Sequence, residues 1–236
     1  MFTRVSKTAL VQKIIRPAMR AQGMLPVMQR SFTGIVDTMG LLEAFGKEFD
    51  FERDNYEAVA EKADFLRTKG FAFHETSDGV TMILSKKIED KTFEISFKSR
   101  QPGHESEGYS LSDDDDINEA SYTDFTVYIT KENKGIIYEC TCLNTEVSIS
   151  QVIFNNNIEN FKKIPVTQRE EAVYLGPDFV SMPEDIQKSL SNFLIDSGLD
   201  QETVAFVEVM SLDKEQRLYM KWLRDVETFV KGSEIF

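Results

Sequence analysis

The spacing of apolar side chains divides the chain into two helical ends and a central region of alternating strands. Between residues 38 and 51 the apolar positions recur every three or four residues, which is typical of an amphipathic helix. The same spacing over residues 54–68 predicts a second helix, which Gly70 would end. We therefore expect the residues that precede the central region to be helical.

The middle of the chain changes to a period of two. Phe93, Ile95 and Phe97 alternate with polar neighbours, as expected of a strand that has one face on a core. Turn sequences such as Asp78-Gly79 separate successive strands, and no helix intervenes, so the pattern predicts an antiparallel sheet. The seven predicted strands cover residues 71–73, 80–84, 93–97, 122–131, 136–143, 147–154 and 171–175.

The last third of the chain returns to helical spacing. A capping box at Ser181 and Glu184 predicts one helix, and Gly198 would end it. Asp200 and Ser211 are predicted to cap two further helices. The last third is therefore expected to contain three helices.

The last of these helices, which reaches about residue 230, has an unusually wide apolar face. Leu212, Tyr219 and Val226 repeat every seven residues, too few heptads for an isolated coiled coil. Two interpretations remain open: the face docks on the chain's own sheet, or one edge also packs on another subunit. The residues predicted for this core or oligomer face are Tyr219, Trp222, Leu223, Val226, Phe229 and Val230.

Residues 99–121 have no periodicity and few apolar groups, which predicts a disordered acidic loop. Its candidate partner-binding acids are Glu105, Glu107, Asp113, Asp114, Asp115, Asp116 and Glu119. The aspartate run does not fit a calcium-binding loop, since Ile117 and Asn118 occupy a ligand position and the required glycine position. The alternative is a solvated charge run that aids solubility.

Charge narrows the choice of partners. The 236 residues contain 40 acidic and 27 basic side chains, a formal net charge of −13, which opposes contact with nucleic acid and favours cationic partners. Residues 1–32 hold six bases and no acid, interleaved with apolar residues, as in a mitochondrial presequence; the alternative is a disordered basic arm. Its removal would leave 21 bases against 40 acids in residues 33–236, a net charge of −19.

The sequence contains no catalytic or metal-binding motif that we recognise. His74 and His104 stand apart, and Cys140 and Cys142 are spaced to point to one face of a strand, where they cannot easily form a disulfide with each other. We therefore expect free, buried thiols, no metal, no cofactor and no enzymatic activity. No stretch approaches the length of a membrane span.

Several segments resemble the mitochondrial acidic matrix protein family, also called the mitochondrial glycoprotein family. The C-terminal sequence Tyr219–Lys231 carries the most specific part of the resemblance, and Ile186–Gly198 is similar to the family's preceding helix. Ile136–Cys142 resembles its cysteine-bearing strand, and Asp113–Asp116 occupies the place of its acidic insertion. The resemblance extends over Met39–Lys231.

This resemblance implies an α+β fold in which a twisted seven-stranded antiparallel sheet is flanked by N- and C-terminal helices, assembled as a doughnut-shaped homotrimer. It also implies location in the mitochondrial matrix, no catalysis, and binding of basic proteins involved in translation, RNA metabolism or respiratory-complex assembly. The chain departs from the animal pattern at Asn155–Arg169 and in the acidic loop. Partners specific to the animal proteins are therefore not expected.

The resulting hypothesis is an acidic oligomeric adaptor that binds Arg-rich, RNA-binding or ribosomal proteins and supports mitochondrial RNA processing, editing or translation without touching nucleic acid itself. One alternative is a matrix divalent-cation buffer or a general chaperone-like acidic protein. Another is an enzyme whose site has no familiar motif.

Overall fold

The computed structural model describes residues 38–100 and 122–232, so the predicted presequence and residues 101–121 of the predicted acidic loop lie outside it. The described chain forms two compact units. One comprises residues 59–212, and the other comprises 38–58 together with 213–232. Helix α7 (Gln201–Gly232) contributes residues to both units.

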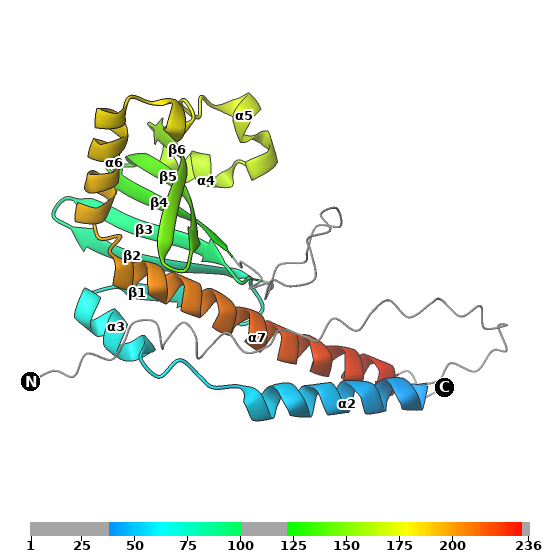
Figure 1. Ribbon diagram of the computed structural model, residues 1–236. Helices are drawn as coiled ribbons and strands as arrows, with labels where there is room; N and C mark the ends of the chain where they lie inside the picture. Colours follow the sequence, from blue (N-terminus) through cyan, green and yellow to red (C-terminus); the bar gives the residue numbers. More distant parts are fainter. Residues whose placement is uncertain (1–37, 101–121, 233–236) are drawn as a thin grey trace, which may run out of the picture. The chain divides into compact units, whose positions relative to one another are not determined.

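The larger unit contains a six-stranded antiparallel sheet in which the strands follow one another in chain order, from β1 to β6 (Figure 1). The six strands coincide with the first six predicted ones and confirm an α+β fold built on an antiparallel sheet. Their bounds are β1 (Ala72–Glu75), β2 (Thr81–Ile88), β3 (Lys91–Lys98), β4 (Thr123–Lys131), β5 (Lys134–Leu143) and β6 (Glu146–Asn155).

The predicted seventh strand, residues 171–175, is wrong. Residues Arg169–Ala172 form the short helix α5, with two glutamates in its first turn, where negative charge is favourable. Val173 and Leu175 alternate with Tyr174 because they pack on a small apolar cluster, not because they pair with a strand. Beyond β6, the described residues add only an isolated bridge from Gln151 to Asp178.

The two faces of the sheet carry two separate cores. The larger core has Phe93 and Ile95 wholly buried and is covered by α3 (Lys62–Lys69), α6 (Glu184–Asp196) and the first part of α7. The smaller core lies on the opposite face under α4 (Ile158–Lys163), and Figure 1 shows α6 and α4 on opposite sides of the sheet. The predicted free thiols of Cys140 and Cys142 are confirmed: both are buried in the larger core.

Tight turns set the register of the hairpins. Glu132 and Asn133 both have positive φ (48° and 64°) and form a two-residue connection between β4 and β5, which suits the twist of the paired strands. Asn144 and Thr145 repeat this arrangement between β5 and β6, with φ of 50° and 67°. A β-branched residue such as Thr145 is strained in this conformation.

The helix predictions are confirmed in part. Helix α2 (Thr38–Asn55) matches the first predicted helix and runs four residues further. The second begins at Lys62 and not at residue 54, and it ends at Gly70, whose φ is +70°.

The predicted helix caps agree less well with the structure than the predicted helices do. Asp200 does cap α7, because it accepts a hydrogen bond from the backbone N–H of Thr203 at 2.9 Å. Ser211 caps nothing: its hydroxyl donates to the carbonyl of Lys98, and α7 continues through it. Ser181 belongs to a short 3-10 helix, η2 (Phe179–Ser181), and α6 begins after Pro183 without a side-chain cap. A second 3-10 helix, η1 (Val166–Gln168), precedes α5.

None of the helices among the described residues combines the length and the apolar character needed to cross a membrane.

Candidate interaction sites

The predicted acidic binding loop falls almost wholly outside the described residues, and all seven of its candidate acids, from Glu105 to Glu119, do so. The two predicted loop residues that are described are held by backbone hydrogen bonds. The N–H of Ser99 donates to Val80 O at 2.8 Å, and that of Arg100 donates to Ser211 O at 3.3 Å. These two residues therefore belong to the folded sheet-and-helix unit.

The predicted face of the last helix divides into buried and exposed members. Leu223 is 3% exposed, whereas Trp222 and Phe229 are 52% and 77% exposed. The remaining three predicted residues, Tyr219, Val226 and Val230, are half-buried. The stripe therefore includes one well-buried side chain and two large aromatic groups that remain in contact with solvent.

Within the smaller unit, the partner of this face is helix α2. The rings of Phe45 and Trp222 lie 5.5 Å apart, and Trp222 also stacks with Tyr219 at 6.0 Å. The guanidinium of Arg224 lies 4.3 Å from the ring centre of Phe49. Such aromatic and cation–π contacts contribute about 0.5–1.5 kcal/mol each.

Polar contacts fix the pairing of the same two helices. The hydroxyl of Tyr219 donates to Glu48 at 3.1 Å, and the amide of Gln216 donates to Glu52 at 3.3 Å. Burial, followed by the nearby Glu48 carboxylate, raises the pKa of Tyr219 to about 12, so the hydroxyl stays a donor at physiological pH. Burial also raises the pKa of Glu52.

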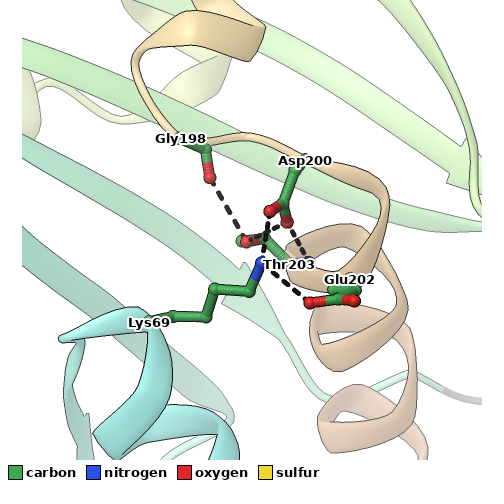
Figure 2. Close-up of polar contacts among 5 residues, drawn as sticks. All are labelled: Lys69, Gly198, Asp200, Glu202 and Thr203. Atoms are coloured by element: carbon green, nitrogen blue, oxygen red, sulfur yellow. Dashed lines mark hydrogen bonds and ion pairs between the residues drawn. The ribbon is translucent and has the colours of Figure 1, made fainter. Parts of the chain in front are cut away.

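An ion-pair cluster joins α3 to the start of α7 (Figure 2). The ammonium of Lys69 contacts Asp200 at 2.5 Å and Glu202 at 2.8 Å. Asp200 also accepts from the N–H and hydroxyl of Thr203, whose hydroxyl reaches Gly198 O as well. Burial opposes ionisation of Asp200, but the hydrogen bonds from Lys69 and Thr203 outweigh this effect and lower the pKa of Asp200. In turn, the hydrogen bonds to Asp200 and Glu202 raise the pKa of Lys69. These acids are therefore structural.

A second polar cluster is buried beside the turn from β5 to β6. The carboxylate of Glu208, 5% exposed, accepts from the strained backbone N–H of Thr145 at 3.0 Å. Arg100 donates weakly to Thr123 at 3.4 Å, and its second terminal nitrogen has no hydrogen-bond partner among the described residues. Burial raises the pKa of Glu208 and lowers that of Arg100, so burial disfavours the charged form of both groups.

The described residues offer little for catalysis. They contain no group of three or more His, Cys, Asp or Glu side chains arranged to hold a metal ion. Burial raises the pKa of Cys140 to about 12 and that of Cys142 further, so neither thiol is poised as a nucleophile. His74 is exposed on the edge strand β1.

A hollow of about 500 Å³ lies along the outer edge of β6. It is lined by Gln151 and by the segment from α5 to Gly176, which includes Glu170, Glu171 and Tyr174. Reasoning from the sequence missed this feature because it assigned residues 171–175 to a strand. The signal that could have shown it is charge: residues 170–187 contain five acids and no Lys or Arg.

Comparison with known proteins agrees with this description. The mitochondrial glycoprotein family profile, MAM33, matches residues 45–230. The mitochondrial acidic protein mam33 of Schizosaccharomyces pombe is 26% identical over 109 residues, 45% of this chain and only 40% of that relative's length.

Two solved structures share the fold. The p22 protein of Trypanosoma brucei has a TM-score of 0.63 at 17% identity, over 83% of this chain and 100% of its own. A Leishmania major protein of unknown function, described as a sequence homologue of human p32, has a TM-score of 0.63 at 18% identity. The match covers 83% of this chain and 99% of the Leishmania chain.

The described chain is therefore an acidic α+β protein, with a six-stranded antiparallel sheet and flanking helices, that shares its fold with these two structures. The chain belongs to the mitochondrial glycoprotein (MAM33) family, a family of mitochondrial acidic proteins, which confirms the resemblance seen in the sequence.

Proposed function

We propose that the protein is a non-enzymatic acidic adaptor of the mitochondrial matrix that binds basic proteins, in particular Arg-rich RNA-binding or ribosomal proteins. In this role it supports mitochondrial RNA processing, editing or translation by holding or releasing those proteins. It needs no cofactor and makes no direct contact with nucleic acid.

The acid excess carries this proposal. With 40 acidic against 27 basic side chains, and a net charge of −19 if the basic leader is removed, the protein attracts cations and repels phosphates. A surface of one sign raises encounter rates with oppositely charged ligands by roughly 10- to 1000-fold at low salt. Since the screening length is about 8 Å at physiological salt, such binding is short-ranged and sensitive to salt.

Assembly as a homotrimer forms part of the proposal. Helix α2 has no buried residue, and Met39, Phe51 and Phe229 are 72%, 60% and 77% exposed. Large apolar side chains exposed on a two-helix unit are typical of a protein–protein interface, and we expect another copy of the chain to bury them. Three mature chains, each at −19, would together carry −57, which would strengthen the attraction for basic partners.

The proposal is tested by purifying residues 33–236, measuring their mass in solution by light scattering, and capturing partners from a matrix extract at low and moderate salt. A mass near three subunits is expected, with Arg-rich RNA-associated proteins bound at low salt and lost as salt rises. A monomer that captures no basic protein would refute both the assembly and the adaptor role.

A further inference from the structure

An exposed patch of mixed character lies along the outer edge of β6. Tyr174 and Val180 are 82% and 79% exposed, among the most exposed large apolar side chains of the described chain. The backbone bridge between Gln151 and Asp178 places the chain leading to Val180 beside the hollow that Tyr174 lines. Gln151, Glu170, Glu171, Tyr174 and Val180 are called the β6-edge patch below.

The backbone that presents this patch is fixed. Val173 and Leu175, on either side of Tyr174, pack on the smaller core, so the tyrosine projects from an anchored strip of extended chain. Gly176 has a φ of +82°, and a Cβ there would lie 2.8 Å from the carbonyl oxygen of Val152. Glycine therefore permits the strip to approach β6 this closely. Since Val173 and Leu175 anchor the strip, a ligand would meet a surface that is already ordered.

Charge selects the kind of occupant. Arg169, the base next to the patch in sequence, is turned inward: it pairs with Glu139 at 3.0 Å and lies 4.6 Å from the ring centre of Phe161. Glu170 and Glu171 have no ion-pair partner among the residues that the structure describes, so their charges are not neutralised within it. A nucleic acid would therefore be repelled, and a cationic segment would be attracted.

We propose that the β6-edge patch docks an arginine-bearing segment of a basic protein. The guanidinium would stack on Tyr174 and pair with Glu170 or Glu171, while an apolar neighbour in the segment would cover Val180. Arginine suits the patch better than lysine, since its planar group both stacks on rings and pairs with carboxylates. The inference rests on the proposed adaptor function and assigns it a location.

The test uses the full chain and a fluorescently labelled peptide in which arginine alternates with leucine, followed by anisotropy at low salt. We expect Glu170→Gln/Glu171→Gln to weaken binding about tenfold and Tyr174→Ala about three- to tenfold. The matched control is Glu61→Gln/Glu89→Gln, which removes the same charge from two exposed carboxylates that lie outside β6 and outside the patch. It should change the Kd by about twofold or less, because it lowers only the overall net charge.

The outcomes separate this inference from the proposed function. If the wild-type chain binds the peptide and the patch variants bind as the control does, the location is wrong and the adaptor role stands. If the wild-type chain binds no peptide, the proposed function fails and this inference fails with it. If the patch variants instead lower the mass measured by light scattering, the patch is a contact between copies, and the inference is overturned.

Discussion

The buried ion pair between Arg169 and Glu139 provides the sharpest test of the described structure. Arg169 lies at the start of α5, with 10% of its side chain exposed, and Glu139 on β5 is 27% exposed. The guanidinium also covers the ring of Phe161, and its Nε has no hydrogen-bond partner among the described residues. Burial raises the pKa of the adjacent Tyr128, an effect that the arginine opposes.

Replacement of Arg169 by Met keeps most of the apolar volume and removes the charge. Removing one partner of a fully buried pair costs about 3–5 kcal/mol, because the other charge is left without compensation. Glu139 is partly exposed and can regain water, which lowers this contribution to about 1–3 kcal/mol. Loss of the contact with Phe161 adds about 0.5–1 kcal/mol. The expected loss in free energy of unfolding is therefore about 1.5–4 kcal/mol.

The assay is denaturant unfolding at fixed protein concentration, applied to Arg169→Met, Glu139→Gln and the double variant. The double variant should recover part of the loss, with a coupling energy of about 1–2 kcal/mol, since no unpaired charge remains. A single Arg169→Met variant within about 0.5 kcal/mol of the wild type would refute the buried pair. Loss of peptide binding in a stable Arg169→Met variant would link this anchor to the β6-edge patch.

Three further predictions follow from the other contacts. Trp222→Ala should lower the free energy of unfolding by about 1–2 kcal/mol through lost ring contacts, measured by the helical circular dichroism signal, and no change would contradict the α2–α7 pairing. The lowered pKa of Asp200 means that its stabilisation is present above its unfolded pKa of about 3.9 and lost as pH falls through the folded value. The stability difference between wild type and Asp200→Asn, about 0.5–2 kcal/mol at pH 7, should therefore vanish in strong acid, and a difference that grew there would contradict the ion pair. Cys140 and Cys142 should react with a thiol reagent at pH 8 only after unfolding, and rapid reaction of the native chain would contradict their burial.

The sheet could be predicted from sequence because local patterning and burial agree in it. The alternation at Phe93, Ile95 and Phe97 corresponds to side chains that are 0–1% exposed, and the predicted Asp78-Gly79 turn does lie between β1 and β2. The family resemblance rested mainly on the sequence Tyr219–Lys231, which lies within the continuous helix α7. In the sheet, local preference and burial favoured the same structure.

The predictions failed where tertiary contacts override local signals. Residues 171–175 have the alternation of a strand, but the apolar cluster under α4 satisfies it without a pairing partner. Ser211 has the sequence context of a helix N-cap, yet its hydroxyl donates a hydrogen bond to the carbonyl of Lys98, which lies on strand β3. Nor could the sequence reveal that Arg169 would point inward, since only the fold brings Glu139 and Phe161 to it.

These paired bases bear on how an acidic protein can select partners. Lys69 pairs with two acids, and Lys162 and Arg169 each pair with an acid on the sheet, so several cations of the larger unit neutralise carboxylates of the same unit. The carboxylates left without partners then determine the surface field. Because exposed ion pairs contribute only about 0–1 kcal/mol each, that field favours encounter with every basic protein and distinguishes poorly among them. Selectivity therefore requires ordered apolar groups beside unpaired acids, the combination found at Tyr174, Glu170 and Glu171.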